Sequence, residues 1–232
     1  MAARNTPRRM RSADAETAPQ PGRRRAPRLN VDARRRQLIE ASVPVFASRP
    51  YDEISIEDIA AEAGVSKGLL YHYFSGKREL YVEVMRDQMA RVWDLTQPDP
   101  ELPALERLRA TLDGYLDYVE AHAQGYASFH RGAMGGNAEV RAAFDEAQAR
   151  QADRILEAMV GSGMRPELLT LAVRGWLNFM VTIVLQWVDD PSIERDQLRD
   201  LLAYSLVNVA TAAGQADPSI EFAEPPPEMP AP

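Results

Sequence analysis

Residues 54–74 read ISIEDIAAEAGVSKGLLYHYF, and this stretch decides the fold of the N-terminal part of the chain. Ser55 followed three residues later by Asp58 predicts a capping box at the start of a short helix. Gly64 can adopt the left-handed turn that other residues resist, and Ser66 can cap a second helix through its hydroxyl group. Two short helices joined by a tight glycine turn form a helix-turn-helix, although a plain helical hairpin remains an alternative.

Outside this stretch the chain has helical periodicity throughout, without strand alternation or a fixed repeat. We expect helices over residues 31–47, 56–63, 67–74, 77–95, 104–122, 126–134, 138–160, 167–188 and 193–213. Pro44 should kink the first helix or shift its start. The expected fold class is all-α, with an N-terminal three-helix helix-turn-helix domain over residues 31–76 and a six-helix domain over residues 77–214.

Both ends of the chain have the composition of disordered segments. Residues 1–30 are rich in Arg and Pro and nearly lack large apolar side chains, and residues 215–232 contain six prolines. Such segments cannot bury enough apolar surface to offset the entropy lost on ordering. We therefore expect a disordered arginine-rich arm and a disordered proline-rich tail.

Composition excludes several classes of site. The chain has no cysteine and only three histidines, so disulfides, thiolate nucleophiles and cysteine-based metal sites are absent, and a zinc site is not expected. No enzyme motif, cofactor motif or metal-ligand spacing is present. The apolar stretch 168–188 is interrupted by Arg174, Asn178 and Gln186, so we do not interpret it as a membrane span. These features predict a cytoplasmic protein that is not an enzyme and needs no cofactor.

Charge is distributed unevenly along the chain. The net charge is −7, yet residues 1–36 carry +8 and the remainder carries −15. This asymmetry suggests a basic arm that meets a polyanion, and a solvated tail without a partner is the alternative.

The AGVSKG run at residues 63–68, the LYHYF run at residues 70–74, and Lys77 with Leu80 resemble the tetracycline-repressor (TetR) family of bacterial transcriptional regulators. The resemblance covers about residues 35–84. It implies a three-helix DNA-binding head, a six-helix domain for effector binding and dimerisation, and binding of a homodimer to double-stranded operator DNA.

The resemblance and the chemistry of the helix-turn-helix together nominate DNA-contacting residues. Lys67 can donate to a guanine edge and Leu69 can contact a thymine methyl group in the major groove. The candidates are Ser55, Ser66, Lys67, Gly68, Leu69, Tyr71, His72 and Lys77. Glu57 stays unassigned. Because residues 37–80 carry a net charge of −3, non-specific affinity should depend on the arginine-rich arm.

The family resemblance also implies a ligand cavity in the six-helix domain. Candidate ligand-binding residues are Trp93, Tyr115, Tyr118, His122, Phe129, His130, Trp176 and Phe179. Their aromatic character favours a small lipophilic effector, although each of them could simply pack the core. Asp113, Asp117 and Glu120 could admit a cation or form a solvated face.

Apolar residues wrap around more than one face of the helices over 167–188 and 193–213, which predicts a homodimer with Leu202 and Leu206 in its seam. The predicted function is a ligand-responsive regulator, a repressor that a lipophilic effector releases from a palindromic operator. A transcriptional activator of the same fold, a helical ligand-binding protein without DNA binding and a helical enzyme with a buried carboxylate site are the alternatives.

Overall fold

The computed structural model describes residues 31–134 and 138–227, and within these ranges the chain is helical without strands. The elements are α1 (Val31–Ser48), the 3₁₀ helix η1 (Tyr51–Glu53), α2 (Ile56–Glu62), α3 (Lys67–Tyr73), α4 (Lys77–Leu95), α5 (Ala104–Ala121), α6 (Ala123–Met134), α7 (Ala138–Val160), α8 (Glu167–Asp189) and α9 (Arg195–Ala216). The expected all-α class is confirmed, and the expected helix ends differ by at most three residues. The arginine-rich arm lies outside the described residues.

Helices α1–α3 and the first turns of α4 form a head around one apolar core. Ser55 Oγ accepts a hydrogen bond from the Asp58 backbone N–H at 3.1 Å, and the Asp58 carboxylate accepts one from the Ser55 N–H at 2.8 Å. The predicted capping box is therefore confirmed. Gly64 has a φ of +62°, which lets the chain turn sharply between α2 and α3. Leu70 and Phe74 then point into the head core and are buried.

Pro44 lies inside α1, which nevertheless runs unbroken from Val31 to Ser48. Within the described residues, α1 therefore continues through Pro44 without a break. Helix α6 packs along this part of α1: Ser128 Oγ donates to the Phe46 carbonyl at 3.0 Å, and Gly125 lies against Ala47. Contacts with α6 thus support α1 where Pro44 removes a backbone hydrogen bond.

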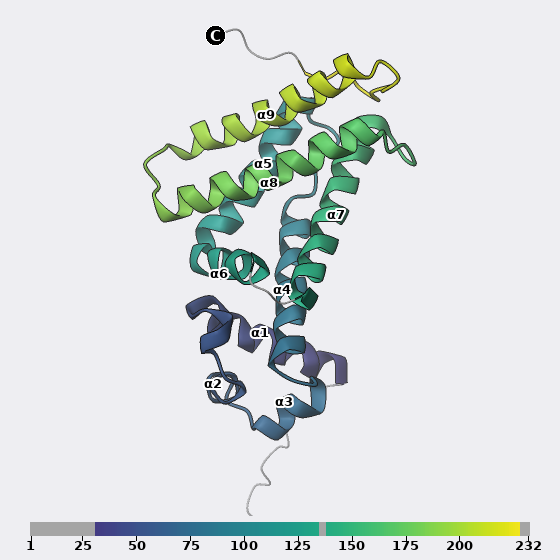
Figure 1. Ribbon diagram of the computed structural model, residues 1–232. Coiled ribbons are helices and arrows are strands. Elements are labelled where there is room, and N and C mark those ends of the chain that lie inside the picture. Colours follow the sequence, from purple (N-terminus) through teal and green to yellow (C-terminus); the bar gives the residue numbers. More distant parts are fainter. Residues whose placement is uncertain (1–30, 135–137, 228–232) are drawn as a thin grey trace, which may run out of the picture.

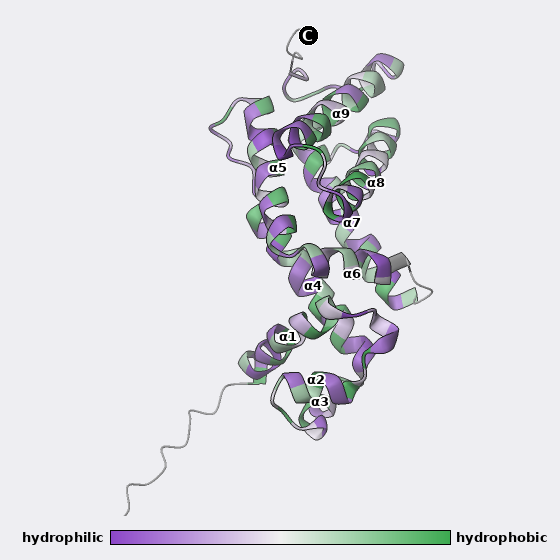
Figure 2. Cartoon of the chain, turned by 90° about the vertical axis from the view of Figure 1, so that its left-hand side faces the viewer, coloured by the Kyte–Doolittle hydropathy of each residue, from purple (hydrophilic) through white to green (hydrophobic). Residues whose placement is uncertain are grey.

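Helix α4 leaves the head and runs into the body, where α5–α9 pack around a second apolar core (Figure 1). Helices α8 and α9 lie side by side and antiparallel at the end of the body away from the head (Figure 1). Helix α6 lies between the rest of the body and α1 (Figure 2). The head and body therefore meet through α1, α4 and α6.

The expectation of a disordered tail from residue 215 is corrected for residues 215–227. Helix α9 continues to Ala216, and the segment after it turns back along the body (Figure 1). Ile220 is buried, Phe222 packs on the body core, and the Ala223 N–H donates to the Met159 carbonyl at 2.8 Å. Because the segment is rich in proline, its composition did not indicate that Ile220 and Phe222 pack on the body.

The outer face of α8 and α9 also differs from expectation in detail. Leu202 and Leu206 are buried inside the body, so they are not available for a dimer seam. Other leucines are exposed instead. Leu201, one position before Leu202, is 47% exposed, and Leu171 on α8 is 69% exposed. Helix rotation decides which leucines face outward, and both sets have similar spacing in the sequence.

Candidate DNA interface and effector cavity

Helix α3 presents its first turn and its outer face to solvent. Ser66 caps the helix by accepting a hydrogen bond from the Leu69 N–H at 3.2 Å, and Gly68 and His72 are exposed. Tyr71 is 53% exposed although it is a large aromatic residue. Leu69 is half-buried against the head core, so only part of its side chain can reach a DNA base.

Two predicted DNA contacts are already engaged within the head. The Lys67 ammonium pairs with the Glu57 carboxylate, and both side chains are exposed at the start of α2 and α3. Lys77 Nζ donates to the carbonyl oxygens of Tyr51 and Ile54 at 2.8 Å each and lies 4.0 Å from the centre of the Tyr51 ring. Lys77 therefore ties α4 to η1. Spacing in the sequence could not show the carbonyls that Lys77 meets, and a phosphate contact at this start of α4 stays a prediction.

A cavity of about 260 Å³ lies in the body between α4, α5, α6, α7, α8 and α9. Of the predicted ligand residues, its walls include Trp93, Tyr115, His130 and Trp176. Most of the remaining lining is aliphatic or aromatic. Burial lowers the pKa of His130 to about 4, because the low-dielectric surroundings penalise the charged imidazolium. Neutral His130 thus adds a polar group to an otherwise apolar wall.

Four predicted ligand residues lie away from the cavity wall. Tyr118 is buried and donates to Gln88 Oε1 at 3.1 Å, and His122 is exposed and stacks on Tyr118 with ring centres 4.5 Å apart. Phe129 faces the head, with its ring centre 5.5 Å from that of Tyr81, and Phe179 is 38% exposed on α8. Each lies on an expected helix, but the rotation of that helix turns the side chain elsewhere.

Sequence reasoning missed three arginines that border the cavity, Arg107, Arg150 and Arg154. Arg154 donates to the Trp93 carbonyl at 3.2 Å and to Thr96 Oγ1 at 2.8 Å, with its guanidinium 4.4 Å from the centre of the Trp93 ring. Arg150 lies 5.3 Å from the same ring centre. No motif in the sequence marks these residues. Helix α5 brings Arg107 to the cavity, and α7 brings Arg150 and Arg154 to Trp93, only in the folded body.

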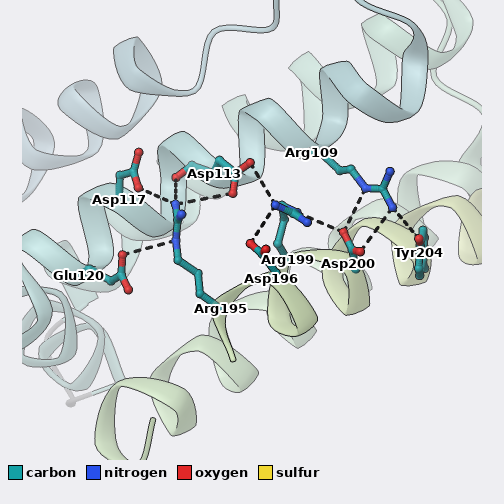
Figure 3. Close-up of polar contacts among 9 residues, drawn as sticks. All are labelled: Arg109, Asp113, Asp117, Glu120, Arg195, Asp196, Arg199, Asp200 and Tyr204. Carbon is teal, nitrogen blue, oxygen red and sulfur yellow. Dashed lines mark hydrogen bonds and ion pairs between the residues drawn. The ribbon is translucent and has the colours of Figure 1, made fainter. Parts of the chain in front are cut away.

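The acidic face of α5 is neutralised by arginines from α9 (Figure 3). Arg195 pairs with Asp113, Asp117 and Glu120, the three acids considered as a cation site. Arg109 of α5 in turn pairs with Asp200 at 3.0 Å. Within the described ranges no group of acidic and histidine side chains could hold a metal ion. These ion pairs therefore hold α5 against α9.

Comparison with known proteins follows the same two-part division. Residues 38–84 match the model of bacterial regulatory proteins of the tetR family, and residues 105–209 match that of the tetracyclin repressor-like C-terminal domain. The chain belongs to the TetR family. It is thus a DNA-binding transcriptional regulator with a helical ligand-binding domain.

Individual TetR relatives support this assignment over different lengths. The HTH-type transcriptional activator FasR of Mycolicibacterium smegmatis is 29% identical over 185 residues, which cover 78% of this chain and 84% of FasR. The HTH-type transcriptional repressor KstR2 of Mycobacterium tuberculosis is 33% identical over 96 residues, 40% of this chain and 47% of KstR2. A crystal structure of a tetR-family regulator from Streptomyces coelicolor is 29% identical, with a TM-score of 0.72 over 83% of this chain and 86% of that chain. These relatives are transcriptional regulators, which are not enzymes.

Helix α8 of this TetR-family protein is long and apolar enough, by length and composition alone, to cross a membrane. Its inner face is buried in the body core through Val173, Leu177 and Val184. Its outer face carries Leu171 and Phe179, and small Gly175 lies exposed between them. One apolar face of α8 thus packs in the core of the body, and a second apolar face is exposed to solvent.

Proposed function

We propose that this TetR-family protein is a cytoplasmic homodimeric repressor that binds a palindromic operator through α3 and is released when a small lipophilic effector occupies the body cavity. The main observation behind this proposal is the position of helix α4. Leu80 and Tyr81, near its start, are buried in the head core, and Trp93, near its end, forms part of the cavity wall. A ligand that displaces the end of α4 would therefore reorient the head.

In this proposal the exposed turn of α3 reads the operator. Lys67 exchanges Glu57 for a base edge, and Tyr71 and His72 contact phosphate or a base. Gly68 permits close backbone approach, and Ser55 and Ser66 lie at helix starts that face phosphates. Lys77 holds α4 in place, and it also contacts phosphate at the start of that helix.

Dimerisation is proposed through the open faces of α8 and α9. Leu171, Phe179, Ile193 and Leu201 are exposed apolar residues on this side, and Gly175 allows close helix approach. Two-fold symmetry would place the recognition helices about 34–36 Å apart, which matches two half-sites separated by one turn of DNA.

The test begins with selection of bound sequences from random duplex DNA, followed by fluorescence anisotropy with the selected fragment. A palindromic fragment bound by two chains supports the proposal, whereas absence of sequence preference contradicts it. An apolar compound that binds the cavity should then lower operator affinity.

Activation of transcription is the second candidate, because FasR, which aligns with this chain over 84% of its own length, is named an activator. A reporter gene placed behind the selected operator separates the two candidates. Repression predicts higher expression when the gene for this protein is deleted, and activation predicts lower expression.

A further inference from the structure

The segment Asp217–Pro227, here called the C-terminal strap, lies across the body after α9. Three contacts fix it at its first half: buried Ile220, the hydrogen bond from the Ala223 N–H to Met159, and the ring of Phe222. A Cβ on Gly214 would lie 2.7 Å from that ring, so the glycine provides the space that the ring occupies. The first half of the strap is therefore an anchored part of the body.

The second half of the strap forms part of the wall of the effector cavity. Residues 224–227 line it, three of them proline. Proline has no backbone N–H, so these three residues can make no backbone N–H hydrogen bond to the body. Among the described residues, the polar contact of this half is the pair between Glu224 and Arg107 of α5, at 2.9 Å. Arg107 is 22% exposed and Glu224 60% exposed, so the pair sits at the mouth of the cavity.

The cavity border has more positive than negative charge. Arg107, Arg150 and Arg154 contribute three guanidinium groups, and Glu224 is the carboxylate that lines the cavity with them. Within the described part of the chain, Arg150 and Arg154 make no ion pair with a carboxylate and instead lie against the Trp93 ring. Desolvation lowers the pKa of Arg154, which shows that its charge is partly removed from water. This excess of positive charge favours an anion at the border.

From these contacts we infer that the effector is an amphipathic carboxylate whose head replaces Glu224 on Arg107, so that binding releases the second half of the strap. This inference rests on the proposed function, because it names the ligand class and the entry route of the same cavity. Because Glu224 is 60% exposed, its pair with Arg107 contributes little, and a ligand carboxylate held inside the cavity gains more from Arg107 than displacement of Glu224 costs. Burial of the apolar chain supplies the rest of the binding free energy. Glu224 keeps the mouth closed until such a ligand arrives.

Calorimetric titration of the full chain with decanoate and with decanol tests the ligand class. We expect decanoate to bind about tenfold more tightly than decanol, as expected for one charged hydrogen-bonded pair. Glu224→Gln should raise decanoate affinity several-fold and leave decanol affinity unchanged, whereas Arg107→Gln should abolish the preference. Glu221→Gln, an exposed acid on the same strap, is the matched control and should change neither affinity. Equal affinities for the two ligands, no binding of either, or an equal effect of Glu224→Gln on both would overturn the inference.

Release of the second half of the strap is tested by a nitroxide label on Pro227→Cys, which is specific because the chain contains no cysteine. Saturating decanoate should narrow the electron paramagnetic resonance lines, and decanol should not. Unchanged lines at saturation would refute strap release.

Operator affinity measured in the same samples separates this inference from the proposed function. A carboxylate preference and a mobile strap with unchanged operator affinity would support the inference and refute the proposed function. Operator release by a neutral apolar compound, equal in wild type and Glu224→Gln, would support the proposed function and refute the inference.

Discussion

Lys67 is the first residue of α3, and its ion pair with Glu57 places an acid beside the side chain that we expect to read the operator. Lys67→Ala should reduce operator affinity about tenfold because it removes a base contact, and Tyr71→Phe should reduce it less. Both side chains are exposed, so helicity by circular dichroism should not change. Wild-type affinity of both variants in anisotropy titrations would refute the assignment.

Substitution of Glu57 gives a separate prediction for the same DNA-facing surface. Glu57→Gln removes a negative charge from the DNA-facing side and frees the Lys67 ammonium. We expect higher affinity for all DNA sequences, because one fewer negative charge faces the phosphates. A change confined to the operator sequence would instead mean that Glu57 contacts a base itself.

His130 makes the free energy of unfolding sensitive to acid. Its pKa is lowered to about 4 by burial, whereas an unfolded histidine titrates near pH 6.5. The unfolded chain therefore binds a proton more tightly between these values, and stability is lost as pH falls through that window. We expect a loss of about 2 kcal/mol from this group between pH 7 and pH 5, measured by urea unfolding. His130→Gln should flatten the slope, while the same substitution at exposed His122 serves as control.

Among the elements, α4 spans the distance from the head core to the cavity. Trp93 lies on the cavity wall under the Arg154 guanidinium, so a ligand that shifts this ring acts on the end of α4. Trp93→Phe should weaken effector binding and reduce the effector's effect on operator affinity. Because this coupling is reciprocal, operator DNA should change effector affinity by the same reduced factor. Asp94→Asn, an exposed neighbour on α4, is the control. An unaltered response of Trp93→Phe to an effective inducer would exclude this route.

Helix α6 offers a second connection between cavity and head. Tyr126 and His130 line the cavity, while Gly132 on the same helix lies so close to the Tyr81 hydroxyl that a Cβ there would overlap with it. Tyr81 belongs to the head core and lies within the second turn of α4. A movement of α6 would therefore reach α4 near its DNA-facing end.

For the whole molecule, the open face of α8 and α9 predicts the assembly state. Light scattering at micromolar concentration should give twice the chain mass of 25.9 kDa. Leu171→Arg or Leu201→Arg should give folded monomers with steeply reduced operator affinity, since each would place an unpaired charge in the seam. Leu202→Arg should behave differently. Because Leu202 is buried within one chain, this substitution should unfold the protein rather than give a folded monomer. A wild-type mass equal to that of one chain would contradict the dimer.

The arginine-rich arm makes a prediction for the whole molecule as well. Removal of residues 1–30 takes away eight arginines and two acids. We expect weaker binding to all DNA sequences and a flatter salt dependence, by roughly one unit for each phosphate that the arm neutralises. An unchanged slope in anisotropy titrations over a salt series would show that the arm does not touch DNA.

The sequence by itself determined the helices and the head, because the signals involved are local. The Ser55–Asp58 capping box and the turn at Gly64 depend on residues within one or two helical turns of each other. The same holds for the apolar periodicity that placed the helices of the described ranges with ends correct to within three residues. Four of the eight predicted ligand residues also reached the cavity wall.

Only the tertiary structure decided which side of each helix faces which neighbour. Tyr115 and Tyr118 lie one helical turn apart on α5, yet only Tyr115 lines the cavity, and Leu201 is exposed where Leu202 is buried. Lys77 meets the carbonyls of η1, and Glu224 meets an arginine 117 residues earlier. Such contacts depend on helix rotation and on pairings across the whole chain, and the spacing of residues along one helix does not contain that information.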